Sequence, residues 1–474
     1  MGETVIIGSG IGGAGIAALR HQKGEATLVL EKEAYPGGCA GTFTRKGLAY
    51  NAGATTLAGF GRGLPVAELF NRAGRALPDI VPTDPGIIVK IGGKTIRRFR
   101  DVERFIDEIN THWPHPAHRP FWRTVHAICD RFYAMGPVYY AKNRPADWLK
   151  TLASLLPIAL RFNTLLLRNG LAYLEALYGE LPGEYRAFLD SQVLIAAQAR
   201  CHEVGVVVMA LSLGYTFFEN GYVTGGMGQA VEMLLGTTPV RYGAGARSIK
   251  REWNGWRVAT EKETFTCEKL VLGTSLFEKT IRFEDADVAA FAAAQAARYN
   301  LTQGAFMVYG TFVGGGVENT HYQVILPKQL PGCISDSLFF SPGHTDDPAM
   351  AAGGRRTFTL SVHTDVAYWK RLEKPAYREA KLATGEAILV ALKAAFPGLV
   401  LHDAFYGTPK SFARYTGRWS VGGIPLTRAN FTPRFPAPDT PFAGLYRTGD
   451  TVFAGQGWIG VSLGVMNLDN VMGR

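Results

Sequence analysis

Cysteine and charge are both scarce in this chain of 474 residues. Charged residues make up 19% of it and apolar residues 47%, which excludes a disordered chain and allows a large core. No C-x-x-C pair occurs, which argues against a disulfide framework or a zinc site and favours a reducing compartment. The five cysteines are Cys39, Cys129, Cys201, Cys267 and Cys333.

Long apolar runs are also lacking. Residues 204–218 form an uncharged, mostly apolar stretch of fifteen residues, which is shorter than the roughly twenty residues of a membrane-spanning helix. The N-terminal sequence MGETVIIGSG does not have the pattern of a secretory signal, so we expect a cytoplasmic protein. The formal net charge of +10 suits an anionic partner surface. Nucleic acid is not the expected partner, because no recognition-helix, zinc-finger or ribonucleoprotein motif is present.

Glycine is abundant, with 56 residues, and its first cluster forms a G-x-G-x-x-G motif at residues 8–13. A β-branched run precedes this cluster, a helical pattern follows it, and a second strand ends at Glu31. This order is typical of a strand–helix–strand unit that binds a dinucleotide. The glycines let a pyrophosphate approach the helix N-terminus, and the acid accepts hydrogen bonds from the ribose hydroxyls. The predicted contacts are Gly8, Gly10, Ile11, Gly12, Gly13 and Glu31.

A second glycine loop follows the acid, although a plain nicotinamide-binding unit does not need one. Residues 31–42 read EKEAYPGGCAGT, and a short strand then ends in YNAG at residues 50–53. This pattern resembles the flavoprotein superfamily that contains monoamine oxidases, protoporphyrinogen oxidases and carotenoid desaturases. The CAG that follows Gly38 is similar to the carotenoid isomerase and retinol saturase branch, whereas many other relatives have arginine there. The resemblance implies FAD contacts at Lys32, Gly38, Cys39, Gly41, Thr42 and Gly53.

The C-terminal segment resembles the end of phytoene desaturase-type enzymes most closely. Residues 444–461 read GLYRTGDTVFAGQGWIGV, and GYVTGGMG at residues 221–228 resembles a second desaturase element. The resemblance implies that Asp450 binds the ribitol of FAD and that a helix beginning near Trp458 points its N–H groups at the flavin. Trp458 either shapes the cavity at the flavin or fills a gap in the core. The implied FAD contacts here are Ala246, Gly449, Asp450, Gly457, Trp458 and Ile459.

The predicted fold is α/β, with a glutathione-reductase-like (Rossmann-type) FAD domain, a mixed-sheet substrate domain and a helical lid. We assign residues 1–75, 222–290 and 415–474 to the FAD domain, and residues 76–221 and 291–414 to the substrate domain. A hairpin is expected over residues 87–99, with its turn at Gly92-Gly93. A long helix is expected over residues 373–395.

The helical block over residues 101–221 contains a segment that is apolar and basic together. Residues 147–178 are rich in leucine, and their few charges are mostly cationic, as in Lys150, Arg161 and Arg168. This composition is typical of a helix that lies on a membrane of anionic lipid, although a buried core or dimer helix has the same pattern. Pro157 is expected to divide the segment into two helices. We therefore expect a peripherally membrane-associated protein.

The resemblance implies an FAD-dependent oxidoreductase of the phytoene desaturase or carotenoid isomerase kind. Its substrate would be a long apolar polyene or isoprenoid, such as a carotenoid or retinoid, and its reaction hydride transfer at flavin N5 or flavin-assisted cis–trans isomerisation. No catalytic residue and no metal are assigned. Tyr215, Phe217, Phe218 and Tyr222 are candidates either for the substrate slot or for the core.

Two alternatives remain open. One is an amine oxidase-like enzyme, although the last cysteine, Cys333, excludes covalent attachment of flavin to a cysteine in the C-terminal tail. The other is a non-catalytic prenyl-binding relative of the same fold that has lost FAD.

Overall fold

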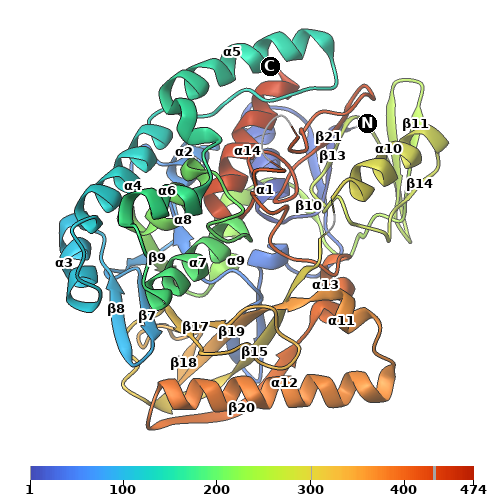
Figure 1. The fold of residues 1–474 in the computed structure, drawn as a ribbon. Coiled ribbons are helices and arrows are strands. Elements are labelled where there is room, and N and C mark those ends of the chain that lie inside the picture. Colours follow the sequence, from blue (N-terminus) through green and yellow to red (C-terminus); the bar gives the residue numbers. More distant parts are fainter. Residues whose placement is uncertain (1, 300, 431–433, 474) are drawn as a thin grey trace.

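Two large sheets and a block of helices form the molecule (Figure 1). The computed structural model describes residues 2–299, 301–430 and 434–473. The first sheet takes its strands from three distant parts of the sequence, in the spatial order β10-β2-β1-β13-β12-β11-β14, with β21 paired to β13. Its strands are β1 (Gly2–Ile7), β2 (Thr27–Leu30), β10 (Val240–Arg241), β11 (Ser248–Glu252), β12 (Gly255–Ala259), β13 (Thr264–Leu272), β14 (Arg282–Phe283) and β21 (Leu445–Arg447).

The central strands of this sheet are parallel and apolar on both faces, as expected for a sheet covered on each side. On one face Ile6, Val29 and Val271 pack against helices α1, α9 and α14, with α2 behind α14. On the other face Val5 and Leu270 pack against the antiparallel pair β11–β12. The helices are α1 (Ile11–Gln22), α2 (Pro65–Arg72), α9 (Met227–Leu235), α10 (Ala286–Ala297) and α14 (Gly457–Met472).

The second sheet is mixed: β16 and β7 are parallel, and the other paired strands of this sheet are antiparallel. Its order is β20-β15-β19-β17-β16-β7-β8, with β18 paired to β19, and α12 covers one face (Figure 1). The elements are β7 (Ile87–Ile91), β8 (Lys94–Arg98), β15 (Gln303–Gly314), β16 (Tyr322–Ile325), β17 (Ser337–Pro342), β18 (Ala351–Ala352), β19 (Arg355–Asp365), β20 (Leu399–Gly407), α11 (Val366–Lys370), α12 (Lys374–Ala395) and α13 (Pro409–Thr416). The hairpin and the long helix agree with the sequence predictions.

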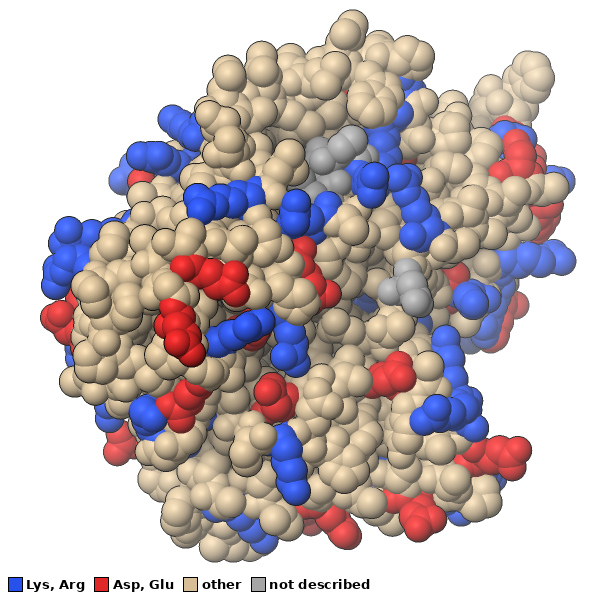
Figure 2. Space-filling view, in the orientation of Figure 1, with Lys and Arg blue, Asp and Glu red and all other residues tan. Residues whose placement is uncertain are grey.

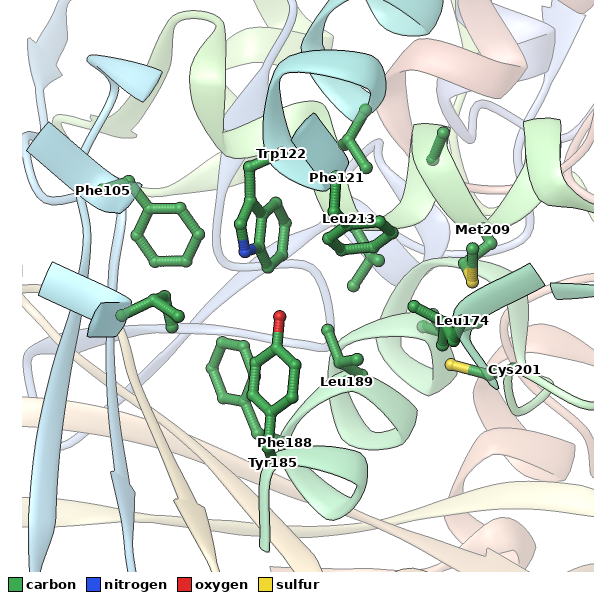
Figure 3. Close-up of a cluster of buried hydrophobic side chains, with 14 of the residues drawn as sticks. Phe105, Phe121, Trp122, Leu174, Tyr185, Phe188, Leu189, Cys201, Met209 and Leu213 are labelled. Carbon is green, nitrogen blue, oxygen red and sulfur yellow. The ribbon is translucent and has the colours of Figure 1, made fainter. Parts of the chain in front are cut away.

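The helical block packs around a large aromatic core (Figure 3). Phe105, Trp122 and Phe188 are completely buried there and surround the guanidinium of Arg98, which lies 4.8 Å from the Phe105 ring centre. The block contains α3 (Val102–His112), α4 (His118–Tyr133), α5 (Pro145–Phe162), α6 (Gly170–Tyr178), α7 (Gly183–Ala197), α8 (Val206–Gly214), and the 3₁₀ turns η2 (Asn163–Leu166) and η3 (Tyr215–Phe217). Smaller elements connect the parts: η1 (Gly38–Ala40), β3 (Thr42–Arg45), β4 (Leu48–Asn51), β5 (Leu57–Ala58), β6 (Ile80–Pro82) and β9 (Asn220–Val223).

Helix α5 corrects one prediction, since it continues through Pro157 as a single helix. A proline removes one backbone hydrogen bond, to the carbonyl four residues earlier, and that residue is Ala153. Ala153 is exposed, so water can take the place of the missing hydrogen-bond donor.

Candidate functional site

A cavity of about 1380 Å³ runs between the first sheet, the second sheet and the helical block. Single small-molecule sites usually measure about 300–1,000 Å³, so this cavity has room for a cofactor and a substrate together. Its first part is lined by loops at the carboxyl ends of β1 and β2, where ligands bind in open α/β sheets.

The N-terminus of α1 forms one end of the cavity, and three glycine segments meet there. Gly10 bridges to Gly37 by backbone pairing, and a side chain at Gly12 would lie 2.8 Å from the backbone nitrogen of Gly449. No side chain caps α1, whose N-cap is Gly10, so its first N–H groups are available to an anionic ligand. Gly449 has φ +113° and no atom within 4 Å of an added side chain, because it faces the cavity.

Glu31 lies at the end of β2, and its side chain is buried in the cavity wall. One carboxylate oxygen accepts hydrogen bonds from the Ser9 backbone nitrogen at 2.8 Å and from the Ser9 hydroxyl. The other oxygen accepts from the Glu33 backbone nitrogen at 2.9 Å. These donors fix the carboxylate beside the first glycine loop, where it keeps further lone pairs for ligand hydroxyls. Ser9 was not among the residues singled out in the sequence.

Most of the predicted cofactor contacts lie on the cavity wall. They are Gly8, Gly10, Ile11, Gly12, Glu31, Lys32, Gly38, Cys39, Gly53, Ala246, Gly449, Asp450, Gly457, Trp458 and Ile459. Ala246 lies beside the acid, since the Ala244 backbone nitrogen donates to the Glu31 carbonyl at 2.8 Å. Their individual contacts with a cofactor stay predictions.

Gly13, Gly41 and Thr42 lie off the cavity wall. A side chain at Gly13 would lie 1.9 Å from the Gly8 carbonyl oxygen, so glycine is needed there for α1 to pack on β1. The Thr42 hydroxyl accepts from the Gly228 nitrogen at 2.9 Å and thereby joins the second glycine loop to α9. These residues do not line the cavity, and they support the loops that do.

Asp450 has a partner that the sequence did not reveal. Arg418 donates to its two carboxylate oxygens at 2.9 and 2.6 Å, and its Nη2 lies 3.6 Å from the Cys39 sulfur. Arg418 follows α13, and no sequence motif marks it.

The second part of the cavity is an apolar chamber between the helical block and the second sheet. Helices supply Ile195, Val208, Leu211, Ser212 and Tyr215, and the sheet supplies Ala305, Met307, Tyr309, Ser337, Phe339, Ser361 and His363. Burial lowers the pKa of His363 to about 4 and raises the pKa of Tyr215 to about 12, so both are neutral at neutral pH. Among the described residues that line the cavity, no carboxylate belongs to this chamber.

Of the four aromatic candidates, Tyr215 alone is part of the cavity wall. Phe217 belongs to the aromatic core, Phe218 stacks on His126 at 5.7 Å, and the Tyr222 hydroxyl donates to Asp347 at 2.6 Å. Core packing is therefore the role of these three residues.

The residues of the first part fit FAD. The N-terminus of α14 opens on the cavity without a side-chain cap, and the indole nitrogen of Trp458 is buried with no hydrogen-bond partner. Buried donors normally have an acceptor, so this orphaned N–H points to a ligand with acceptor atoms at that place. The motifs predicted FAD, and the residues that line this part of the cavity agree with that prediction.

Sequence comparison identifies relatives along the whole chain. Residues 6–73 match the model of the NAD(P)-binding Rossmann-like domain. Prolycopene isomerase 2 of an Oncidium hybrid cultivar is 25% identical, over 98% of this chain and 82% of the relative. The human all-trans-retinol 13,14-reductase is 43% identical over 51 residues, which is 11% of this chain and 8% of the relative.

Solved structures share the whole architecture. An oxidoreductase from Methanosarcina mazei superposes with a TM-score of 0.64 at 18% identity, covering all of both chains. A fatty acid isomerase from P. acnes that produces CLA has a TM-score of 0.60 at 14% identity, covering 100% of this chain and 99% of its own. Putrescine oxidase bound to putrescine has a TM-score of 0.59 at 14% identity with the same coverage. The chain is therefore a homologue of the prolycopene isomerases, built on the fold of the FAD-dependent amine oxidase-like flavoproteins.

Proposed function

We propose that this protein is an FAD-dependent oxidoreductase or isomerase that acts on a long apolar polyene or isoprenoid of the carotenoid or retinoid class. The observation that carries the proposal is the apolar chamber, whose walls are mainly aliphatic and aromatic and whose His363 and Tyr215 side chains are neutral. Its homology to prolycopene isomerase and retinol reductase agrees with a substrate of this kind.

The chemistry that FAD supplies when bound is acceptance or donation of a hydride at N5. The residues of the chain itself bind the substrate and orient it. Leu211 and Val208 on α8 line the chamber together with Met307 and Phe339 of the second sheet, and such apolar walls would exclude water and hold a linear apolar chain. No protein group is needed as a nucleophile for either hydride transfer or cis–trans isomerisation.

The amine oxidase-like alternative has structural neighbours but no support in the chamber. A cationic amine entering a dry cavity needs a carboxylate partner or an aromatic cage with access to water, because the cost of burying an unpaired charge is large. The four lining carboxylates, Glu31, Glu33, Glu278 and Asp450, all belong to the first part of the cavity.

The test is an anaerobic assay of the purified holoprotein, with FAD oxidised and reduced, against prolycopene, all-trans-retinol, linoleic acid and putrescine. We expect prolycopene or retinol to be converted to a product. Chromatography identifies the product, and flavin absorbance reports the oxidation state of FAD. Change of double-bond geometry without a net flavin change indicates isomerisation, and stoichiometric bleaching or reoxidation indicates hydride transfer.

A pair of variants tests the chamber. Leu211→Lys places a charge in it and should abolish conversion, whereas Leu382→Lys, at a residue 56% exposed on α12, should not. Turnover of putrescine alone contradicts the proposal in favour of an amine oxidase. A colourless protein that does not bind added FAD supports the prenyl-binding alternative.

We also propose that α5 attaches the protein to the surface of an anionic membrane. Its polarity is reversed with respect to an ordinary surface helix. The side that faces the protein is polar: Asp147 accepts from the Tyr139 hydroxyl at 2.7 Å, and the Thr151 hydroxyl donates to the Ala141 carbonyl at 2.7 Å. The side that faces outward is apolar, with Leu149, Leu152, Leu156 and Leu160 each more than half exposed.

This outward face is a stripe of leucines with cations beside it. Lys150, Arg161 and Arg168 are exposed near the stripe, and Figure 2 shows the uncharged upper edge of the molecule with basic side chains below it. The described chain has one helix, Pro145–Leu166, that is long and apolar enough to cross a bilayer. Its polar inner side is bound to the protein, which favours a helix lying in the interface.

Flotation with vesicles tests the attachment. We expect the protein to float with phosphatidylserine vesicles at low salt, and less with phosphatidylcholine, since each cation contributes about 1 kcal/mol near an anionic surface. Leu156→Ser with Leu160→Ser should abolish flotation, while Leu382→Ser with Val390→Ser, on exposed α12, should leave it intact. Flotation that is equal on both lipids, or resistance to alkaline extraction, would contradict an electrostatic, peripheral attachment.

A further inference from the structure

We infer that Arg418 is a binding residue for the diphosphate of the dinucleotide, in addition to its ion pair with Asp450. The inference rests on the proposed function, because it takes FAD as the dinucleotide. Arg418 comes from the segment after α13, and its side chain is only 6% exposed. Among the described lysines and arginines on the cavity wall, Arg418 is the one that is buried. The others are exposed or half-buried: Lys32, Arg45, Lys381, Lys410 and Arg414.

The position of the guanidinium follows from its two contacts. Cys39 adjoins Gly38, and Asp450 adjoins Gly449. A side chain at Gly38 would lie 3.6 Å from the Gly10 Cα, and one at Gly12 would clash with the backbone of Gly449. Arg418 therefore lies where the second glycine loop and the C-terminal loop meet the N-terminus of α1, which is the place for a diphosphate in a fold of this kind.

The charges at this point require a cation. A diphosphate close to the Asp450 carboxylate would meet strong like-charge repulsion inside a poorly solvated cavity. Arg418 neutralises the carboxylate through two of its five N–H donors, and a third faces Cys39. The remaining donors can bind a phosphate oxygen, for which the planar guanidinium is well suited.

An ion pair alone is a weak explanation for this arrangement. The desolvation of the buried guanidinium offsets much of its attraction to Asp450, whose side chain is 22% exposed, so the pair contributes little net stability. A guanidinium that binds a ligand anion as well as Asp450 has a function in ligand binding, which explains why it is buried at this place.

The test measures binding of FAD, ADP and riboflavin to the apoprotein by fluorescence and calorimetry. Arg418→Met should weaken FAD and ADP binding by ten- to hundredfold, since a hydrogen bond to a charged group is worth about 1.5–3 kcal/mol. Riboflavin, which has no phosphate, should bind as to the parent. Arg418→Lys should retain part of the affinity, and the control Arg378→Met, at an exposed position on α12 that does not line the cavity, should retain all of it.

The double variant Arg418→Met with Asp450→Asn removes both charges and so avoids an unpaired carboxylate on the cavity wall. We expect it to bind ADP more weakly than Asp450→Asn alone. Equal ADP affinity of these two variants would show that Arg418 acts only through Asp450, and equal losses for riboflavin and FAD would show a general distortion; either result overturns the inference. Failure of the parent to bind FAD contradicts the proposed function instead.

Discussion

Glu31 shows how one side chain joins the protein and the proposed ligand. Its carboxylate is held by the Ser9 and Glu33 backbone nitrogens at 2.8 and 2.9 Å, and Glu31 lines the cavity. Because both donors are backbone groups, the orientation of the carboxylate is set before a ligand arrives.

We predict that Glu31→Ala weakens FAD binding by about tenfold or more, because a charge-assisted bond is worth about 1.5–3 kcal/mol. Ser9→Ala removes one protein contact of the carboxylate but no predicted ligand contact, and it should bind FAD nearly as the parent does. Titration of the apoproteins with FAD measures both. If the Glu31→Ala variant retains FAD through dialysis as well as the parent does, the acid is misassigned.

The buried side chain of His321 makes the stability of the protein depend on pH in the acid range. It is completely buried, its ring nitrogens lie 3.2–3.3 Å from the Thr56 hydroxyl, and burial lowers its pKa to about 3. The unfolded chain has an ordinary histidine pKa near 6.5, so it takes up the proton first as the pH falls. The contribution of neutral His321 to the free energy of unfolding is therefore fully present above pH 6.5, and it is lost as the pH falls from 6.5 to 3.

We therefore predict that the free energy of unfolding falls by about 2 kcal/mol between pH 7 and pH 5 on account of His321. His321→Gln should remove that part of the pH dependence, whatever its effect on stability at pH 7. His202→Gln, at an exposed position, should leave the slope unchanged. Denaturant unfolding at several pH values gives the comparison, and identical slopes for the parent and the His321→Gln variant would contradict the prediction.

At the scale of elements, α14 brings its N-terminus to the cofactor part of the cavity. Gly457 has φ +72°, a conformation that favours glycine, and it lets the helix begin directly at the cavity wall. Trp458 packs in the core behind it, while its indole nitrogen stays without a protein partner. The tryptophan thus fills the gap between helix and sheet and also lies on the cavity wall, so both interpretations of this residue from the sequence have support.

We predict that Trp458→Phe lowers FAD affinity by about five- to tenfold, the loss of one hydrogen bond of about 1–1.5 kcal/mol. The apoprotein should unfold at the same or a higher temperature, because the variant removes an unsatisfied buried donor. Leu468→Ile, further along α14 and distant in sequence from the cavity-lining turn, serves as the packing control. A loss of apoprotein stability with unchanged FAD affinity would assign Trp458 to packing alone.

The residues predicted to contact a dinucleotide come from both ends of the sequence and line the same cavity. Glu31 and Cys39, Ala246, Arg418, and Asp450 come from four separate segments and line one cavity. A ligand that binds only this assembled state stabilises it by mass action, by about 2.7 kcal/mol at one hundred times its Kd.

We predict that FAD at this concentration raises the unfolding free energy of the apoprotein by about 2.7 kcal/mol, whereas NADH and NADPH at the same concentration do not. The nicotinamide nucleotides are the relevant controls because residues 6–73 match a model described as NAD(P)-binding. Denaturant titrations with each nucleotide provide the measurement. Equal stabilisation by NADH would contradict the choice of FAD over a nicotinamide cofactor.

Local chemistry is what the sequence by itself determined. The glycine spacing at residues 8–13, the acid at the end of β2 and the C-terminal GD pair predict a dinucleotide site, because these residues act through backbone geometry close to them in sequence. The hairpin over residues 87–99 and the α/β fold class follow from periodicity in the same way. The domain boundaries predicted from the sequence stay a prediction.

Contacts between distant segments were decided only by the tertiary structure. Arg418 lies 32 positions before Asp450 and 379 after Cys39, and no local pattern announces that the three converge. Helix α5 passes through Pro157 because water reaches the freed carbonyl, and its leucines face outward because its polar side chains bind the protein. Burial and partner choice depend on the packing of the whole chain, and these physical quantities are not encoded in any short stretch of sequence.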